Sequence, residues 1–253
     1  FMKKAENASV RIIPLGGLEQ IGMNITAIEY DDSIVVVDCG LSFPEEDMLG
    51  IDLVIPDVTY LKENAHKVKG LVVTHAHEDH IGAIPYVEKE INLPIYATKL
   101  TMGIIENKIK EHNLIKTTKR KVVKHGQIIN LGCFRIEFIR TNHSIADSAG
   151  LAIYTPAGII IHTGDFKIDY TPVFGEVMDL PRFAELGKKG VLALMADSTN
   201  VERPGFTMSE RTVGKTFDNL FADNRENRII VATFASNVDR VQQIINSAYK
   251  FGR

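Results

Sequence analysis

Three histidines and two acidic residues crowd into six positions of the sequence, His75 to His80, directly after an apolar run. The stretch reads LVVTHAHEDHIGA over residues 71–83. In an extended backbone alternate side chains share a face, so His75 and His77 point the same way. Asp79 and His80 follow where the chain turns into a helix, and they aim at a neighbouring point. One short segment can therefore offer ligands to two adjacent metal ions.

The types of these side chains favour particular metals. Imidazole and carboxylate ligands without a thiolate favour zinc, with manganese as the main rival. The competing interpretation is a surface loop with a capping aspartate and incidental histidines. That interpretation is disfavoured because three of the eight histidines in the chain fall within this one segment.

Further ligand candidates stand at the ends of other apolar runs. Asp38 ends the run VVVDCG, His143 follows a strand-like run in IRTNHSIADS, and Asp165 does the same in IIIHTGDFK. Taken singly, each is more often a turn residue or a satisfied polar group than a ligand. Together with the histidine segment, they predict a site at the rim of a sheet that holds two metal ions.

The elements that must position these residues are mostly short strands. Period-two and continuous apolar runs predict strands at 10–15, 24–30, 33–40, 70–74, 121–125, 134–141, 150–155 and 158–164. Apolar residues spaced by three and four predict helices at 80–91 and 100–114. Because several strands are apolar throughout, we expect sheets that are covered by helices.

The last quarter of the sequence alternates strand and helix, in the order strand 191–197, helix 207–221, strand 228–234 and helix 236–252. A capping box of Thr207 and Glu210 is expected to open the first of these helices. Gly252 is expected to end the second, whose apolar face comprises Val238, Val241, Ile245 and Ala248. This order is that of the start of an α/β unit, and we expect an interrupted domain here.

The composition is that of an ordinary globular protein. Of 253 residues, 45% are hydrophobic and 24% are charged, and the net charge of −3 excludes a globally basic nucleic-acid binder. The two cysteines, Cys39 and Cys133, lie far apart without a CxxC pair, so a disulfide framework is not expected. Since no apolar run approaches the roughly 18 residues of a membrane span, we expect a soluble, cytoplasmic protein without membrane contact.

The order of the candidate ligands, Asp, HxHxDH, His, Asp, resembles that of the metallo-β-lactamase superfamily. DSTN at 197–200 and the following ERPGFTMSE resemble the first motif of the β-CASP nucleases. With LGGLEQIGMN, FPEEDMLGIDLVIPD and TFASNVDR, the whole chain resembles the N-terminal part of the bacterial ribonuclease J family. The resemblance implies an α/β fold, with an αββα metallo-β-lactamase sandwich over residues 2–205. The truncated beginning of an α/β β-CASP domain would follow over residues 206–253.

The resemblance also implies a ligand set. It implies two divalent metal ions per active site, Zn²⁺ first, with Mn²⁺ or Mg²⁺ as alternatives, held by His75, His77, Asp79, His80, His143 and Asp165. One ion would be bound by His75, His77 and His143 and the other by Asp79 and His80, with Asp165 bridging the two.

Further roles are carried over from the family. The catalytic residues would be Asp38, Asp79, Asp165 and Asp197. Asp38 would orient the histidine segment, and Asp197 would act as an acidic group near the leaving group. His162 is either a further orienting residue or a satisfied strand histidine. Ser236 and Asn237 are interpreted either as part of a substrate-phosphate pocket or as an ordinary helix cap with Ser236 as the capping residue.

The function implied is a metal-dependent ribonuclease with endonuclease and 5′-to-3′ exonuclease activity in RNA maturation and decay, including rRNA processing and mRNA decay. The expected partners are single-stranded RNA with a 5′-monophosphate, and a homo-oligomer or RNA-degradation complex formed through regions missing here. The family carries two further histidine motifs, whereas all histidines here lie at or before His162, so the chain alone is expected to be incomplete as an enzyme. The alternatives are a small-molecule hydrolase of the same fold, such as a thioester hydrolase, and a non-catalytic RNA- or partner-binding subunit.

Overall fold

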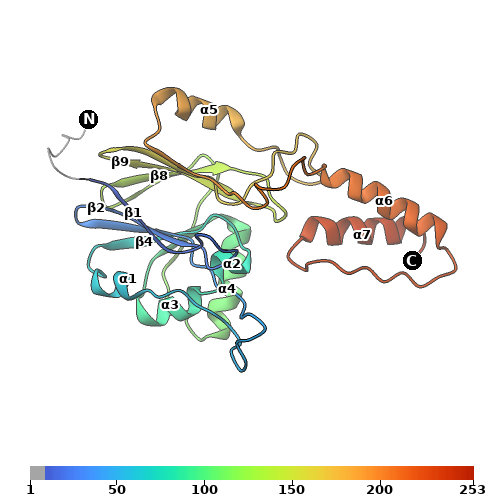
Figure 1. The fold of residues 1–253 in the computed structure, drawn as a ribbon, viewed down its shortest axis with the longest axis horizontal. Helices are drawn as coiled ribbons and strands as arrows, with labels where there is room; N and C mark the ends of the chain where they lie inside the picture. The colour runs from blue at the N-terminus through green and yellow to red at the C-terminus, as the bar shows by residue number, and fades with distance from the viewer. Residues whose placement is uncertain (1–8) are drawn as a thin grey trace.

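Two β-sheets lie face to face in the computed structural model, which describes residues 9–253 (Figure 1). The first sheet is antiparallel from β1 to β3 and parallel from β3 to β6. Its strands, in sheet order, are β1 (Arg11–Gly16), β2 (Ile25–Tyr30), β3 (Ser33–Val37), β4 (Val68–Val72), β5 (Ile95–Ala97) and β6 (Arg120–Val122).

The second sheet is antiparallel except at one edge, where β10 and β11 run parallel. In sheet order its strands are β11 (Ala193–Met195), β10 (Gly158–His162), β9 (Ala149–Thr155), β8 (Phe134–Arg140) and β7 (Ile128–Leu131). The strands predicted at 150–155 and 158–164 form the hairpin of β9 and β10, and the Thr155 hydroxyl accepts the N–H of Gly158 across its turn, at 3.1 Å.

Helices cover the outer face of the first sheet and form a core with it. They are α1 (Thr59–Glu63), α2 (Glu78–Ile81), α3 (Ile84–Glu90) and α4 (Lys99–Glu111). The single helix predicted at 80–91 is wrong, because the segment forms two helices. Pro85 lies in the first turn of α3, where its missing N–H costs nothing, but it could not have continued the hydrogen bonds of α2.

Apolar residues pack in three layers, and β3 shows why some strands are apolar throughout. Ile34 and Val36 point into the core beneath the helices, whereas Val35 and Val37 point into the core between the sheets. A third core joins the outer face of the second sheet to α5 (Leu180–Lys189), a helix that the sequence analysis did not predict. The predicted αββα sandwich is therefore confirmed.

Two further helices, α6 (Glu210–Asp223) and α7 (Val238–Lys250), pack against each other beyond the sandwich (Figure 1). The strand predicted at 228–234 is wrong, since these residues form no strand. A strand needs a neighbour to pair with, and β11 pairs with β10 while no described strand reaches this segment. Ile230 is consequently 88% exposed.

The ends and faces of these two helices differ from the sequence predictions. Ser209, not Thr207, caps α6 and accepts the Arg211 N–H. On α7 the buried residues are Gln243 and Ser247, whereas Val238 and Ile245 of the predicted apolar face are more than half exposed. The pair buries Phe217 and Phe221 of α6 and also forms polar contacts, including a hydrogen bond of 2.8 Å from Ser247 Oγ to Asp218 Oδ1.

The domain boundary predicted between residues 205 and 206 lies in segment 196–209, which forms no helix or strand. The first residues of the predicted sandwich domain, 2–8, lie outside the described residues. None of the helices within residues 9–253 is both long and apolar enough to cross a membrane.

Candidate metal centre

The predicted ligands come together at one rim of the sandwich, where loops from both sheets meet. Asp38 directly follows β3, and the segment with His75 and His77 follows β4, which runs parallel to it. His143 lies in the loop between β8 and β9, and Asp165 follows β10. Within residues 9–253, two groups of side chains have ligand atoms that all lie within 4.8 Å of one another, and both groups include Asp165.

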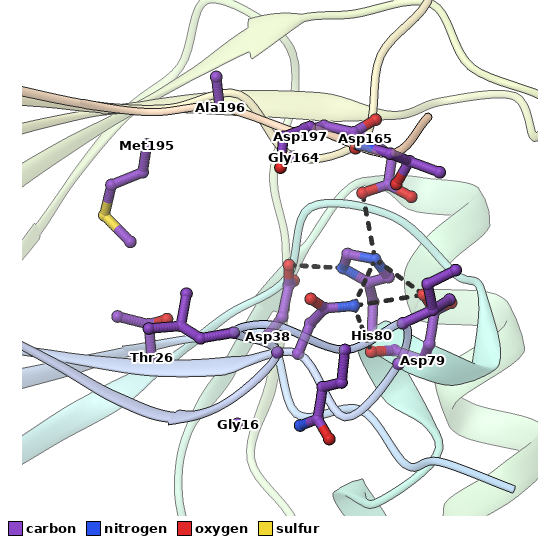
Figure 2. Close-up of a pocket in the computed structure, with 18 of the residues that line it drawn as sticks. Gly16, Thr26, Asp38, Asp79, His80, Gly164, Asp165, Met195, Ala196 and Asp197 are labelled. Atoms are coloured by element: carbon purple, nitrogen blue, oxygen red, sulfur yellow. Dashed lines mark hydrogen bonds and ion pairs between the residues drawn. The ribbon is translucent and has the colours of Figure 1, made fainter. Parts of the chain in front are cut away.

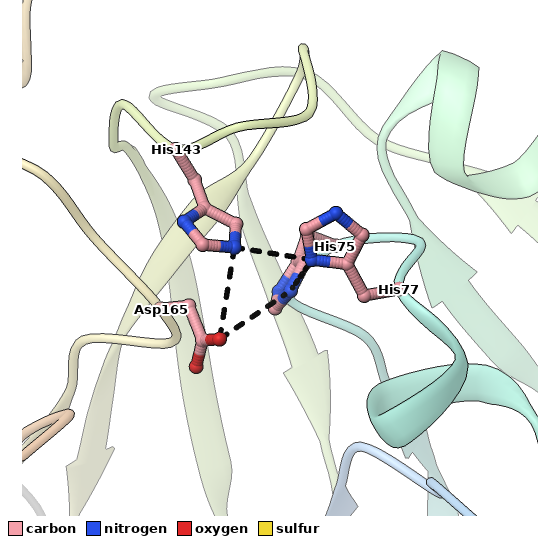
Figure 3. A group of neighbouring side chains, drawn as sticks. All are labelled: His75, His77, His143 and Asp165. Atoms are coloured by element: carbon pink, nitrogen blue, oxygen red, sulfur yellow. Dashed lines mark hydrogen bonds and ion pairs between the residues drawn. The ribbon is translucent and has the colours of Figure 1, made fainter. Parts of the chain in front are cut away.

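The first group, called here the three-histidine group, consists of His75, His77 and His143 with Asp165 (Figure 3). His77 Nδ1 lies 3.1 Å from both His75 Nε2 and His143 Nε2. Asp165 Oδ2 lies 3.6 Å from His143 Nε2. Burial lowers the pKa of His75 well below its usual value and that of His143 to about 4, so these imidazoles are neutral and their lone pairs are free to bind a cation.

The second group, called here the carboxylate group, consists of Asp79, His80 and Asp165 (Figure 2). His80 Nε2 lies 3.3 Å from Asp165 Oδ1 and 3.5 Å from Asp79 Oδ2. Burial opposes a charge on His80, but Asp38 and the two carboxylates of the group outweigh it and raise the pKa of His80 well above its usual value. The carboxylates around His80 therefore favour a positive charge at this point, which a bound cation would also supply.

Asp38 forms hydrogen bonds that orient residues of both ligand groups. Its Oδ1 accepts the Thr74 N–H, and its Oδ2 accepts the Thr74 hydroxyl and His80 Nδ1, each at 2.8 Å. Because the Thr74 hydroxyl donates to Asp38, its oxygen accepts from His75 Nδ1, 3.0 Å away, and the His75 Nε2 lone pair faces the other histidines. Asp38 is buried and has φ +58, a strained conformation for a non-glycine residue and one that recurs at functional sites.

These residues fit a divalent metal ion. Three imidazole nitrogens converge in the three-histidine group, and one proton cannot bridge three nitrogens at once. His77 directs Nδ1 to this point, while its buried Nε2 has no hydrogen-bond partner among the described residues. Nitrogen ligands in one group and carboxylates in the other, joined by a shared Asp165, suit zinc or a related divalent ion.

Comparison with known proteins agrees with this geometry. Residues 21–185 match the model of the metallo-beta-lactamase superfamily, and residues 226–253 match that of the ribonuclease J beta-CASP domain. The chain belongs to the metallo-β-lactamase superfamily. Residues 21–185 contain Asp38, the histidine segment, His143 and Asp165, so the superfamily match spans the whole candidate centre.

The resemblance to ribonuclease J is also confirmed. Ribonuclease J of Synechocystis sp. (strain PCC 6803) is 49% identical over 253 residues, which cover 99% of this chain and 39% of that protein. Ribonuclease J of Helicobacter pylori (strain J99) is 49% identical over all of this chain and 36% of its own length. The chain thus spans less than two fifths of either relative.

One solved structure has the same fold as this superfamily member. A protein of unknown function from Enterococcus faecalis V583 superposes with a TM-score of 0.70 at 20% identity, over 95% of this chain and 63% of that one. At this identity the likeness concerns the fold alone, and it supports the sandwich rather than any activity.

A cavity of about 880 Å³ opens beside the carboxylate group of this metallo-β-lactamase fold (Figure 2). Asp197 lines it, with its main-chain N–H donating to Thr163 Oγ1 at 3.1 Å and its Oδ1 accepting the Thr199 N–H at 2.8 Å. His162 also lines the cavity, and its Nδ1 accepts the Gly164 N–H at 3.1 Å, which favours the interpretation as a satisfied strand histidine.

The structure does not bring Ser236 and Asn237 to this cavity, whose lining among the described residues does not include them. Asn237 is the capping residue of α7, because its side chain accepts the Arg240 N–H at 3.1 Å, and Ser236 is exposed. The predicted cap by Ser236 is therefore wrong. A phosphate-binding role for the two residues stays a prediction.

The sequence analysis missed the loop of residues 16–24 as part of the site. This loop lines the cavity opposite Asp197, and Asn24 contacts two of the candidate ligands. The motif LGGLEQIGMN was recognised only as a family resemblance. The glycines of this motif could have indicated the site. Gly17 and Gly22 have φ of +83 and +98 and allow a tight bend beside the ligands.

Proposed function

We propose that the chain carries the metal centre of a ribonuclease of the ribonuclease J kind, which hydrolyses RNA phosphodiester bonds as an endonuclease and a 5′-to-3′ exonuclease. The observation that supports this most is the meeting of two ligand groups at one shared carboxylate, Asp165, beside an open cavity. The relatives named ribonuclease J support RNA as the substrate.

In this proposal two divalent ions bind at the centre, Zn²⁺ first, with Mn²⁺ or Mg²⁺ as alternatives. One is held by His75, His77 and His143, the other by Asp79 and His80, and Asp165 is shared. When bound, the ions supply Lewis acidity that activates water and neutralises the negative charge of a phosphodiester.

The remaining roles fall to residues of this chain. Asp38 fixes the orientation of Thr74 and His80 through three hydrogen bonds, so that the histidine segment keeps its geometry before substrate arrives. Asp197 lines the cavity on the same side as Asp165 and would act as an acidic group near the leaving oxygen, together with a partner histidine. Ser236 and Asn237 would contact a substrate phosphate in the assembled protein.

The proposed substrate is single-stranded RNA, with preference for a 5′-monophosphate, in RNA maturation and decay. We further propose that the protein acts in the cytoplasm, as a homo-oligomer or within an RNA-degradation complex. Both cysteines, Cys39 and Cys133, are free thiols, as is usual in a reducing compartment. The extent of the domains, 2–205 and 206–253, is part of the same proposal.

The test is to assay the 253-residue chain, and a protein extended to the length of its relatives, on 5′-monophosphate and 5′-triphosphate RNA with and without a chelator. Cleavage by the extended protein should require metal and should be abolished by His77→Ala or Asp165→Asn, while circular dichroism shows both variants folded. Cleavage that a chelator leaves unchanged would refute the metal centre. Hydrolysis of a thioester or lactam without RNA cleavage would favour the small-molecule alternative.

A further inference from the structure

Asn24 forms hydrogen bonds with the carboxylate group and, within the described residues, none with the three-histidine group. Its side-chain Nδ2 lies 3.1 Å from the Asp79 main-chain oxygen and 3.2 Å from Asp79 Oδ2. The same nitrogen lies 3.1 Å from His80 Nε2. A single amide therefore contacts two of the three candidate ligands of this group.

The loop holds this amide in one place. The Asn24 main-chain N–H donates to the Asp79 oxygen at 3.0 Å, and the Asn24 oxygen accepts the Gly40 N–H at 2.9 Å. On the other side, a Cβ at Gly17 would lie only 2.7 Å from Asn24 Oδ1. Because the Asp79 main-chain oxygen and Oδ2 can only accept, the donor end of the amide faces the ligands.

The two amide hydrogens match the two acceptors of Asp79 once the lone pair of His80 Nε2 is engaged elsewhere, as it is when His80 binds a cation. Asn24 has two hydrogens on Nδ2 but faces three acceptors, two on Asp79 and one on His80. In neutral His80, Nδ1 donates to Asp38 and Nε2 carries the lone pair that a metal ion uses. Once that lone pair is committed, two acceptors remain for two hydrogens.

We propose that Asn24 is a positioning residue for the carboxylate group: it orients Asp79 toward His80 and Asp165 and selectively strengthens metal binding there. The inference rests on the metal centre of the proposed function. Asn24 acts through Asp79 rather than on substrate, so its effect is expected in metal affinity, at one group and not the other.

The experiment measures the stepwise Zn²⁺ dissociation constants of the chain by competition with a chelator. Asn24→Ala removes the amide, and Asn24→Leu removes it while keeping most of the volume. Both should weaken one of the two binding steps about 10- to 100-fold and change the other less than about twofold. The matched control is Asn64→Ala, which removes an amide that donates to the Tyr60 oxygen at 2.9 Å in α1, and it should change neither step.

A double-mutant cycle assigns the affected step. Asp79→Ala should weaken the same step, and Asn24→Ala should add nothing on that background if it acts through Asp79. Unchanged Zn²⁺ affinity, equal weakening of both steps, or additive effects in the cycle would each overturn the inference. A lower melting temperature of the metal-free Asn24 variants at unchanged Zn²⁺ affinity would leave Asn24 a purely structural role.

The same titration separates this inference from the proposed function. If the unsubstituted chain binds no Zn²⁺, the metal centre itself is wrong. If the unsubstituted chain binds two ions and the Asn24 variants bind them equally well, only the positioning role fails.

Discussion

The sandwich and the helical pair of α6 and α7 differ in the side chains that they bury. In the sandwich, both faces of β3 are covered, and large side chains such as Phe134 and Phe138 are fully buried. In the helical pair, Phe217 and Phe221 of α6 are buried together with the polar Gln243 and Ser247 of α7, while other apolar side chains of the same part of the chain are exposed. The sandwich is thus held by extensive apolar packing, whereas the helical pair combines a small apolar contact with polar contacts.

The difference teaches where precise geometry is possible in this chain. His75, His77, His143 and Asp165 lie on loops that follow strands of the sandwich, and Asp79 and His80 lie in the short helix α2 directly after the loop of β4. Side chains on such a support can be held within the short distances that a metal site requires. The helical pair lacks this support within the described residues, and no candidate ligand lies there.

The largest effect is expected when a large side chain is removed from the core between the sheets, because this creates a cavity there. Phe134 is fully buried there, so Phe134→Ala should lower the free energy of unfolding by about 3–5 kcal/mol. Urea denaturation followed by circular dichroism measures this value. A loss below about 1 kcal/mol would show that the sandwich is not held by this core.

Metal binding should stabilise the sandwich alone. Zn²⁺ at about one hundred times its dissociation constant should add about 2.7 kcal/mol to the free energy of unfolding, because the ion binds only the folded state. Amide hydrogen exchange should show increased protection in the loops after β3, β4 and β10 and little change in α6 and α7. Equal protection of the helical pair would mean that the two regions unfold together.

A buried carboxyl group makes the sandwich sensitive to pH. Burial raises the pKa of Glu88 to about 7, while Glu88 Oε1 accepts the Leu93 N–H at 3.0 Å. The folded state favours the protonated form, so this contribution to stability is present below about pH 4.5 and is lost as the pH rises through about 7.

Glu88→Gln keeps the acceptor and removes the charge. The variant should match the unsubstituted chain near pH 4.5 and exceed it by about 1–3 kcal/mol at pH 8. Thermal unfolding at the two pH values tests this expectation. A difference that does not depend on pH would show that Glu88 is ionised in the folded chain throughout.

The smallest effect on stability is expected in the segment between α6 and α7, which exposes apolar side chains. Ile230 is 88% exposed, so Ile230→Ser should change the free energy of unfolding by less than about 0.5 kcal/mol. Light scattering should show less self-association of the variant, because exposed apolar side chains promote it. A large loss of stability would mean that residues 228–234 pack against the chain in solution.

Sequence reasoning succeeded where short-range pattern decides the structure. Most strands of the sandwich follow from apolar runs such as that ending at Asp38, although β5 and β7 were not predicted, and the ligands follow from their positions at strand ends. It failed where the local structure depends on which other segments of the same chain pack against the residues. Residues 228–234 have the composition of a strand but no described partner, and the face that α7 buries is set by α6 rather than by its own periodicity.

Asn24 illustrates a third kind of limit. Its role is invisible in the sequence, because it depends on a loop that bends back over a segment 55 residues away. No local pattern distinguishes such an asparagine from one in an ordinary turn. Only the contacts among the folded loops show that its amide faces the ligands.

The placement of Asp38 at the end of a strand with two covered faces has one more consequence. Neighbouring residues of β3 belong to different cores, so neither core can loosen without moving the carboxylate behind the ligands. The metal centre is therefore not expected to lose its geometry at a lower temperature than the sandwich. On heating, we expect the bound ion to be released at the temperature at which the sandwich unfolds. A folded sandwich with a disrupted metal centre should not accumulate at any lower temperature.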